Sequence, residues 1–469
     1  MRWLIFCLFL SASMAQAALP VSLQAALTKA QLPVDSVAIV VQPLDGGAPL
    51  ISHNASKPMN PASVMKVVTT YAALEALTPA YRWKTEVYRN GPVNQGILDG
   101  DLIIKGYGDP ALNVAEFWQL LQQVQQQGIR QIKGNLILDT SVYMPEVSQR
   151  AVLDDEPWRA YNANPNALLM NGRHTSFRFG VAKEGIKPVV TIAQEFALPQ
   201  ISIVNLMQIR KGACADWRSD LHYAVAPTVE GATVTFSGTL PEQCDARYLE
   251  LSVLNDTQYI LFSFQKLWAQ LGGQFNGRAM VAALPADARL VTTWLSPPLD
   301  AVIRDINKWS NNVMARQVML TIGLEAGLAP VDENAAALAL QHTLHTRGLS
   351  FPELVLENGS GLSRHERISA EHLAQLLVTA YQRPVMPVLM ASLPILGLDG
   401  TLKKRLSEPV SQGMAYLKTG SLEGVSSIAG YVQDAQGKRY VLVMMVNHPH
   451  AAVARTVQDG LIKGLIEGH

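Results

Sequence analysis

Hydrophobic positions change their spacing along the chain, and each spacing predicts a type of element. Apolar residues recur every three to four positions in 256–271, 311–326 and 369–381, which is the period of amphipathic helices. Residues 36–41 and 440–447 are instead short runs rich in β-branched and other apolar side chains, as strands are. Because strands lie near both ends of the chain with helices between them, we expect the two terminal segments to share one sheet.

The middle third of the chain has a different pattern. Residues 85–160 combine short alternating strands with a glutamine-rich helix, and residues 161–257 are almost entirely strand and turn. We therefore predict one domain formed by residues 18–84 and 258–469. Residues 85–257 would be an inserted region of two parts, an α+β part at about 85–160 and a β-rich part at about 161–257.

The N-terminus has the three parts of a secretory signal. A short basic start precedes an apolar run from Trp3 to Leu10, and small residues follow up to an A-x-A site at 15–17. We expect residues 1–17 to be removed and the exported protein to reside in the periplasm. No later segment is apolar over the length that a bilayer requires, so no membrane span is predicted in the mature protein.

Charge argues against a nucleic-acid partner, and the cysteines indicate a disulfide. The chain has 38 basic and 38 acidic residues, so no overall field favours nucleic acid. Cys7 would leave with the signal, and the remaining Cys214 and Cys244 lie in polar, turn-rich surroundings. In an oxidising compartment two such cysteines usually form a disulfide, although two free thiols remain the alternative because sequence does not give their separation.

A candidate nucleophile lies where an Asn-Pro turn leads into an apolar helical segment. Ser63 and Lys66 fall on the first turn of this helix and project from the same face, so a neutral lysine amine could take the serine's proton. Backbone N–H groups at a helix start have no partner within the helix and could stabilise an oxyanion. A second S-x-x-K, Ser263 to Lys266, lies in the middle of a predicted helix and is interpreted as a chance match.

Two further short motifs follow along the chain. Ser310-Asn311-Asn312 lies between two predicted helices, and Lys418-Thr419-Gly420 lies in a strand-rich stretch. Each has a structural alternative, because Ser310 and Asn312 could cap a helix and Lys418 could be a solvated strand residue. The ordered set S-x-x-K, S-x-N, K-T-G, each in a suitable local structure, is nevertheless a strong signal for a serine acyl-transfer enzyme.

This set resembles that of the penicillin-binding proteins and serine β-lactamases. The long insertion, with the stretches 106–110, 359–364 and 399–402, resembles the D-alanyl-D-alanine carboxypeptidase/endopeptidase branch of class C, the penicillin-binding-protein-four type. The resemblance implies an α/β (α+β) fold, in which a transpeptidase-like domain with an antiparallel sheet flanked by helices carries a large, mostly β insertion. One departure is Asn358, where relatives carry aspartate, so no charge-dependent role is assigned to it.

The chemistry and the resemblance together imply catalytic roles. Ser63 would attack a peptide carbonyl, and Lys66 would accept its proton if burial and neighbouring positive charge depress the lysine pKa. Ser310 would relay a proton to the leaving amine. Asn312 would orient Lys66 and the substrate amide.

Substrate binding is assigned to the third motif. Lys418 and Thr419, with Gly420 in the same motif, would hold the free carboxylate of a terminal D-alanine. The backbone N–H groups of Ser63 and Ser421 would form the oxyanion hole, as the family arranges them. The substrates implied are peptidoglycan stems ending in D-Ala-D-Ala and cross-linked muropeptides, with β-lactams as acylating inhibitors.

Two other functions share these motifs. A serine β-lactamase would need rapid deacylation, but no E-x-x-L-N supplies the deacylating glutamate, and the insertion is not typical of those enzymes. A non-catalytic penicillin-binding or cell-wall module would keep the pocket without turnover.

We expect no cofactor or metal, because His448 and His450 have no third clustered ligand.

Overall fold

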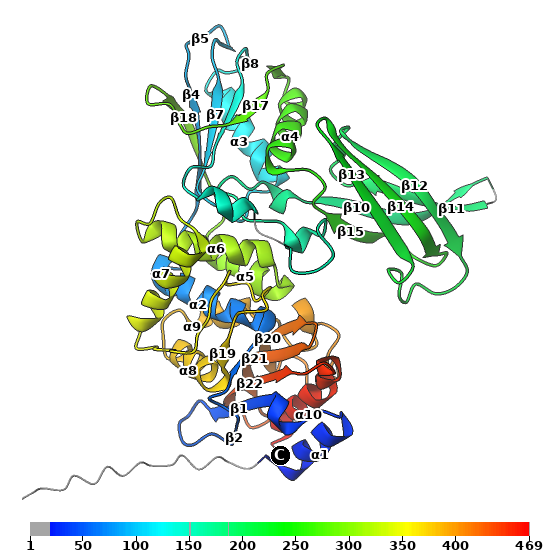
Figure 1. The fold of residues 1–469 in the computed structure, drawn as a ribbon, viewed down its shortest axis with the longest axis vertical. Helices are drawn as coiled ribbons and strands as arrows, with labels where there is room; N and C mark the ends of the chain where they lie inside the picture. Colours follow the sequence, from blue (N-terminus) through cyan, green and yellow to red (C-terminus); the bar gives the residue numbers. More distant parts are fainter. Residues whose placement is uncertain (1–18, 150–151, 186, 469) are drawn as a thin grey trace, which may run out of the picture.

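The structure is a computed structural model that describes residues 19–149, 152–185 and 187–468. The expected signal sequence, residues 1–17, lies outside the described residues. Helices and strands are combined in an α/β architecture, as predicted, and Figure 1 shows three parts along the molecule. A lower part contains both ends of the described chain, an upper part carries two small sheets, and a β-rich arm projects to one side.

The lower part is organised around a five-stranded sheet with the order β2-β1-β22-β21-β20. Its strands are β1 (Val37–Pro43), β2 (Ile51–His53), β20 (Ala415–Leu422), β21 (Val425–Gln433) and β22 (Arg439–Asn447). All neighbouring strands are antiparallel, and β1 pairs with β22. This pairing confirms the prediction that the terminal segments share one sheet, and it leaves β20 at an edge.

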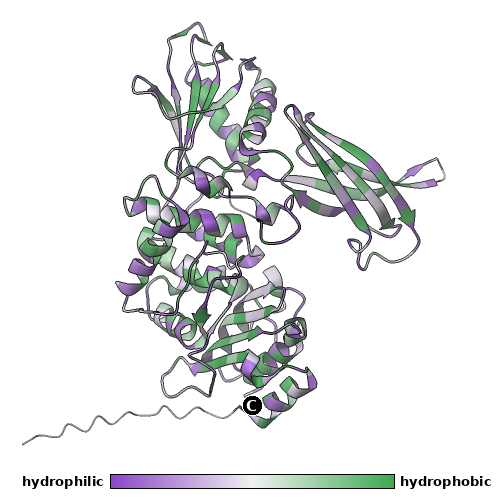
Figure 2. Ribbon diagram, viewed as in Figure 1, coloured by the Kyte–Doolittle hydropathy of each residue, from purple (hydrophilic) through white to green (hydrophobic). Residues whose placement is uncertain are grey.

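Helices cover both faces of this sheet. Alternate residues of β1 face opposite sides, so Ile39 packs with α1 (Val21–Lys29) and α10 (Ala454–Glu467), whereas Val40 packs toward the remaining helices. Strands β21 and β22 are therefore buried along most of their length, and β22 is hydrophobic from Val441 to Val446. Figure 2 shows green segments in this sheet. By contrast, the arm strands carry hydrophilic bands.

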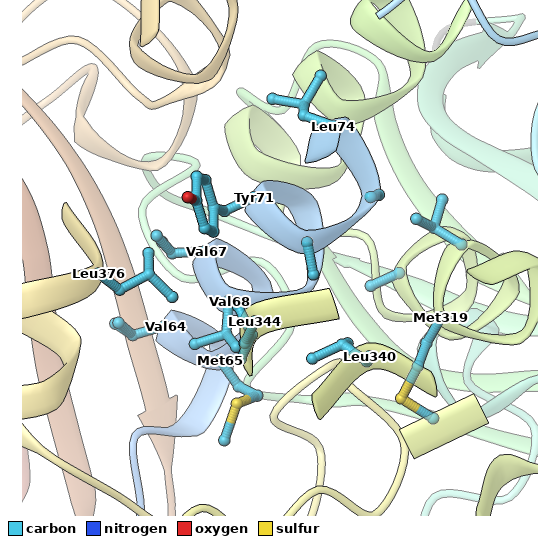
Figure 3. Close-up of a cluster of buried hydrophobic side chains, with 14 of the residues drawn as sticks. Val64, Met65, Val67, Val68, Tyr71, Leu74, Met319, Leu340, Leu344 and Leu376 are labelled. Atoms are coloured by element: carbon cyan, nitrogen blue, oxygen red, sulfur yellow. The ribbon is translucent and has the colours of Figure 1, made fainter. Parts of the chain in front are cut away.

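Helix α2 (Met65–Leu77) lies at the centre of the helical layer. Figure 3 shows Val64 and Val68 among side chains from the surrounding helices, including Met319 and Leu376. A helix that is apolar on almost every side is stable only when it is buried on almost every side, and this packing holds the start of α2 in place. The neighbouring helices are α5 (Leu299–Trp309), α6 (Asn312–Glu325), α7 (Glu333–His345), α8 (Ala370–Tyr381) and α9 (Met386–Ser392). Short connecting elements are β3 (Pro58–Met59), β19 (Ile368–Ser369), η1 (Val34–Ser36), η2 (Ala62–Val64), η6 (Gly400–Leu402) and η7 (Ala451–Val453).

The upper part contains a five-stranded sheet, β17-β9-β7-β4-β18, and a four-stranded sheet, β16-β8-β6-β5. Helices α3 (Val114–Gln126) and α4 (Asp256–Gln270) pack in the same core. The strands are β4 (Lys84–Arg89), β5 (Val93–Asn94), β6 (Ile97–Leu98), β7 (Leu102–Gly106), β8 (Gln131–Ile132), β9 (Leu136–Asp139), β16 (Gln274–Phe275), β17 (Ala279–Val281) and β18 (Arg289–Leu295). Three 3₁₀ turns connect this part to its neighbours, namely η3 (Pro145–Gln149), η4 (Ala160–Asn162) and η5 (Asn171–Arg173).

Residues 256–295 pack with the inserted region, although the sequence predicted that the insertion ends at residue 257. Helix α4 packs with the inserted elements, and β18 pairs with β4. The two ends of this region are joined at its base, where Ser296 N donates to Trp83 O over 2.9 Å. We therefore propose that the inserted region extends to about residue 295. Helical periodicity could not reveal this, because it shows that a helix has an apolar face but not which core buries that face.

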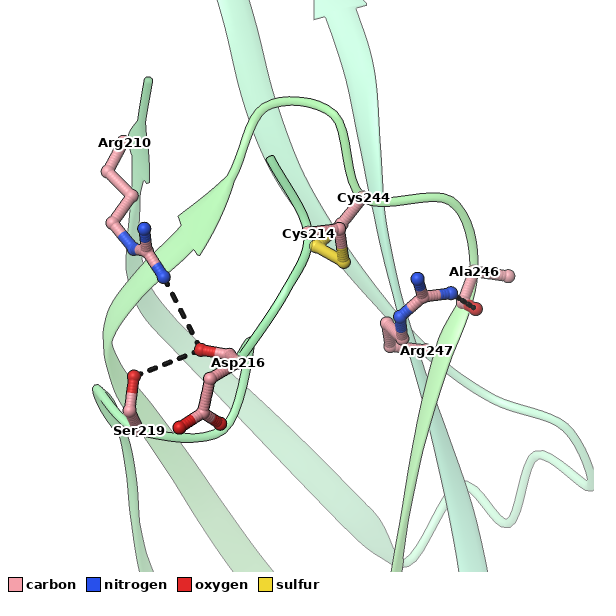
Figure 4. Close-up of a disulfide and its surroundings, with 7 residues drawn as sticks. All are labelled: Arg210, Cys214, Asp216, Ser219, Cys244, Ala246 and Arg247. Carbon is pink, nitrogen blue, oxygen red and sulfur yellow. Dashed lines mark hydrogen bonds between the residues drawn. A yellow bond between two sulfur atoms is a disulfide. The ribbon is translucent and has the colours of Figure 1, made fainter. Parts of the chain in front are cut away.

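The arm consists of two three-stranded sheets, β11-β10-β15 and β12-β14-β13. Its strands are β10 (Thr175–Glu184), β11 (Lys187–Gln194), β12 (Ile201–Arg210), β13 (Leu221–Thr228), β14 (Gly231–Pro241) and β15 (Arg247–Leu251). Phe179 and Phe236 pack edge to face between the sheets. The predicted disulfide between Cys214 and Cys244 is present and joins two loops of the arm (Figure 4).

In the part of the chain that the structure describes, no helix has both the length and the apolar composition needed to cross a membrane.

Candidate active site

Ser63 lies at the point where the chain enters the central helix. The helix predicted to begin at Ser63 begins as the 3₁₀ turn η2 and continues as α2. The preceding Ala62 has a left-handed φ of 45°, so the backbone turns sharply before the serine. Ser63 remains partly accessible while Lys66 is fully buried, and Lys66 Nζ lies 3.0 Å from Ser63 Oγ. The candidate base therefore contacts the candidate nucleophile from the buried side of the site.

The Lys66 amine has two further partners, both of them carbonyl-type oxygens. Nζ donates to Asn312 Oδ1 at 2.6 Å and to the backbone oxygen of Ser360 at 2.5 Å. A neutral amine has two N–H groups and one lone pair. Because the two oxygens occupy the N–H groups, the lone pair of neutral Lys66 is directed at Ser63 Oγ, where it can accept a proton.

The surroundings of Lys66 favour that neutral form. Burial lowers the pKa of Lys66 well below its ordinary value, and the positive charge of Lys418 lowers it further. The carboxylate of Glu366 acts in the opposite direction and raises the Lys66 pKa. Burial is the largest of these influences, so the net effect is a lysine that can serve as a base near neutral pH.

The second motif is presented by the junction between two helices. Ser310 ends α5 in a left-handed conformation with a φ of 59°, and Asn312 is the first residue of α6. The residue that caps α6 is Asn311, whose side chain accepts from Met314 N at 3.1 Å. Neither Ser310 nor Asn312 is therefore the N-cap of α6, although Ser310 is the C-cap residue of α5.

The third motif places a second buried lysine beside Ser310. Lys418 on β20 is fully buried, and its Nζ donates to Ser310 Oγ at 2.9 Å and to Thr419 O at 2.8 Å. Burial lowers the pKa of Lys418 to about 7. The Thr419 hydroxyl lies 2.8 Å from the hydroxyl of Thr401, a residue in η6 that was not predicted as part of the site. The three motifs therefore meet in one place.

Two glycines let the backbone approach Ser63 closely. A Cβ atom on Gly420 would lie 2.5 Å from Pro61 O and 3.0 Å from Ser63 N. A Cβ atom on Gly361, whose φ is +80°, would lie 1.9 Å from Ala62 O. A larger residue at either position would displace the backbone next to Ser63, so this close approach depends on a glycine on each side of the nucleophile. Ser421, next to Gly420, is exposed at the same edge of the sheet.

The loop 357–363 is the part of the site that sequence reasoning missed. The stretch 359–364 was noted only as a family feature, yet its Ser360 oxygen contacts Lys66. Asn358 stabilises the loop with both ends of its amide, since Oδ1 accepts from Ser360 N at 2.9 Å and Nδ2 donates to Leu362 O at 3.0 Å. A carboxylate could not make the second bond, which gives Asn358 a neutral, structural role.

Comparison with known proteins identifies the family. Residues 19–465 match the D-Ala-D-Ala carboxypeptidase 3 (S13) family over nearly the whole chain. The chain belongs to the S13 family. It is accordingly a serine-type peptidase of the D-Ala-D-Ala carboxypeptidase class, and the resemblance to penicillin-binding proteins of this branch is confirmed.

Relatives of this S13 peptidase cover most of its length. It is 27% identical over 416 residues to the D-alanyl-D-alanine carboxypeptidase DacB of Haemophilus influenzae, a match covering 88% of this chain and 85% of the relative. It is 28% identical over 450 residues to the D-alanyl-D-alanine carboxypeptidase of an Actinomadura species, covering 92% and 81% of the two chains.

Solved structures support the same fold. The crystal structure of penicillin binding protein 4 from Haemophilus influenzae matches with a TM-score of 0.76 and 25% identity, covering 94% of this chain and 100% of that one. A predatory endopeptidase from Bdellovibrio bacteriovorus matches with a TM-score of 0.54 and 15% identity, covering 92% and 93%, and shows a likeness in fold alone.

Two cavities adjoin the site of the S13 peptidase. One, of about 520 Å³, is lined by Ser310 and Asn312 and by the acidic side chains of Glu116, Glu250 and Asp305. Burial raises the pKa of Glu116 to about 7. The other, of about 600 Å³, begins at Thr419 and follows the β20–β21 hairpin. One cavity thus adjoins the second motif and the other adjoins the third motif.

Proposed function

We propose that this peptidase uses Ser63 to hydrolyse peptidoglycan stems that end in D-Ala-D-Ala and cross-linked muropeptides, and that it does so in the periplasm. The observation that carries the proposal is the arrangement of Lys66. Its amine is held by Asn312 and Ser360 in a way that directs its lone pair at Ser63. The expected signal sequence and the disulfide support export into an oxidising compartment.

Acylation would follow from these contacts. Ser63 Oγ attacks the carbonyl carbon of the penultimate D-alanine while its proton moves to Lys66 Nζ. The oxyanion that forms accepts hydrogen bonds from the backbone N–H groups of Ser63 and Ser421. The free carboxylate of the terminal residue binds the Lys418 ammonium and the Thr419 hydroxyl, with Gly420 allowing the strand to approach the serine.

Departure of the leaving group and hydrolysis complete the cycle. The C–N bond breaks, and Ser310, which accepts a hydrogen bond from Lys418, relays a proton from that lysine to the departing amine. Exchange with solvent then returns Lys66 to its neutral form and Lys418 to its ammonium form. Neutral Lys66 takes a proton from a water molecule as the water oxygen attacks the acyl carbon. The ester C–O bond then breaks, Lys66 returns the proton to Ser63 Oγ, and the shortened stem leaves with a free carboxyl group.

Room around the site supports cleavage of cross-links as well as removal of D-alanine. The cavity of about 600 Å³ begins at Thr419, where the leaving group's carboxylate would bind. A leaving group larger than D-alanine therefore has space beyond the carboxylate site. On this basis we propose both carboxypeptidase and endopeptidase activity.

The test is incubation with purified peptidoglycan fragments, followed by chromatography for free D-alanine and for uncoupled monomeric muropeptides. Both products should appear with the wild type and neither with Ser63→Ala. Fast catalytic consumption of penicillin with little D-alanine release would favour a β-lactamase. Stable penicillin labelling without either product would favour a non-catalytic penicillin-binding module.

A further inference from the structure

A carboxyl group that sequence reasoning did not single out lies behind the loop that holds Lys66. Glu366 is fully buried, and its Oε1 accepts three backbone N–H groups, from Glu357 at 3.1 Å, Asn358 at 2.9 Å and Gly359 at 2.8 Å. Within the described residues, its Oε2 is buried without a hydrogen-bond partner. One carboxylate oxygen thus accepts hydrogen bonds from three consecutive backbone amides at the beginning of the loop.

The same loop is tied to the nucleophile's helix along its length. Thr69 Oγ1 donates to Gly359 O at 2.6 Å, Lys66 Nζ donates to Ser360 O at 2.5 Å, and Asn60 Nδ2 donates to Ser363 O at 2.8 Å. Gly361 lies directly against the backbone before Ser63. A shift at the beginning of the loop would therefore move the oxygen that orients the Lys66 amine.

We propose that Glu366 is a positioning residue, which holds the 357–359 backbone so that the Ser360 oxygen meets Lys66 and the lysine lone pair faces Ser63. The inference rests on the proposed role of Lys66 as the base. Glu366 hydrogen-bonds the loop and not Ser63. Its negative charge also raises the Lys66 pKa, but replacement by alanine or by glutamine removes that charge equally, so a difference between the two variants reports on the loop. The loss of its acceptor oxygen releases the three amides and lets the Ser360 oxygen move away from Lys66.

Three variants separate positioning from simple structural support. Glu366→Ala removes the acceptor, whereas Glu366→Gln keeps an acceptor oxygen at the same place. Glu353→Ala is a matched control, because Glu353 is a partly buried carboxylate in the same segment that accepts from Ser369 N at 2.9 Å and contacts His372 instead of the loop. All three full-length proteins are titrated with fluorescent penicillin to count folded, competent sites.

The readout is the acylation rate constant k2, separated from the non-covalent dissociation constant for penicillin and expressed per competent site. We expect k2 to fall about tenfold to a hundredfold in Glu366→Ala, because misplacement of a catalytic group by about 1 Å has effects of this size. The dissociation constant should change little. Glu366→Gln should restore most of k2, and Glu353→Ala should keep the wild-type value.

Equal k2 values in Glu366→Ala and the wild type would overturn the proposal. So would a Glu366→Gln variant as slow as Glu366→Ala, or an equal loss in Glu353→Ala. Failure of the proposed function is distinguishable, because it would appear as penicillin labelling that persists in Ser63→Ala whatever residue occupies position 366.

Discussion

At the scale of single residues, the same short motif has two different outcomes in this chain. Ser63 is half-buried beside the Lys66 amine, whereas Ser263 is fully buried within α4, and its hydroxyl has no partner among the described residues. Lys266 donates to Ala197 O and lies over the ring of Phe196. The motif acquires chemistry only where the helix start leaves the serine accessible and the lysine is buried beneath it.

Penicillin labelling tests this contrast directly. Labelling should be absent in Ser63→Ala and should persist in Ser263→Ala. In Lys66→Ala the acylation rate should fall by roughly 10²- to 10⁴-fold, because the general base is lost. The measurement is in-gel fluorescence at several times after mixing with a fluorescent penicillin. Loss of label in Ser263→Ala alone would contradict the assignment of the nucleophile.

The two buried lysines predict a bell-shaped pH dependence of kcat/KM. Lys66 must be neutral, so activity should rise as pH increases through its lowered pKa. Lys418 must be charged to bind the substrate carboxylate, so activity should fall as pH increases through its pKa of about 7. The alkaline limb of kcat should lie higher, because a bound carboxylate stabilises the ammonium form.

A substrate with a C-terminal amide provides the control for this profile. Since it has no carboxylate to bind Lys418, its hydrolysis should be weaker but should keep both limbs. Its alkaline limb should lie near the Lys418 pKa of about 7 in kcat as well as in kcat/KM, because the charged lysine is still needed as the proton source for the leaving amine and no bound carboxylate stabilises it. Initial rates of product release between pH 5 and 10 give both profiles. A kcat/KM that continues to rise from pH 7 to 9 with the natural carboxylate would contradict the role of Lys418.

At the scale of elements, the site depends on backbone segments that approach one another without side chains between them. The start of α2 lies between the edge strand β20 and the loop 357–363, with Gly420 on one side and Gly361 on the other. Buried Lys308 pairs with the partly exposed Asp399, with Nζ and Oδ2 2.6 Å apart, and this pair holds the segment that presents Thr401. The elements thus position the reactive groups as rigid neighbours, which reduces the reorganisation needed during catalysis.

Substitution of Gly361 by alanine should impair acylation through this close approach. The added Cβ would lie 1.9 Å from Ala62 O, so the turn before Ser63 must move. We expect the acylation rate to fall about a hundredfold. Gly437→Ala is the matched control, because Gly437 has a similar φ of +86° with no atom within 4 Å of the added Cβ.

Both glycine variants should lose about 1–2 kcal/mol of folding stability from the left-handed backbone alone. Thermal unfolding and penicillin acylation measured on the same samples separate strain from displacement. If Gly437→Ala acylated as slowly as Gly361→Ala, general destabilisation and not the contact with Ala62 would explain the loss.

At the scale of the whole molecule, the lower part carries the reactive groups and the arm lies apart from them. Figure 1 shows the arm projecting away from β20, and the Cys214–Cys244 disulfide lies within it. Val142, Tyr143, Val147 and Ala167 of the inserted region, however, pack into the same core as α2. The base of the insertion therefore packs with the core around α2, whereas the buried residues of the arm belong to the core of the upper part.

Removal of the disulfide should weaken the arm without stopping catalysis. The two cysteines are 30 residues apart, and a closed loop of that length stabilises a fold by about 3–4 kcal/mol in the chain-entropy account. The double variant Cys214→Ser/Cys244→Ser should unfold at lower denaturant concentration, yet acylate Ser63 at the wild-type rate. Two reactive free thiols in the native wild-type protein, or a parallel loss of acylation, would contradict this prediction.

The sequence alone determined the family, the fold class, the three motifs and the shared terminal sheet, because each leaves a local pattern of spacing or composition. Tertiary structure decided what those patterns could not contain. Lys66 meets Ser360 across 294 positions of sequence, and Thr401 meets Thr419 only because η6 packs beside β20. The extent of the insertion was likewise decided by which core buries α4. Local sequence patterns show that a helix or strand has an apolar face. Which other segment packs against that face is decided by the packing of the whole chain.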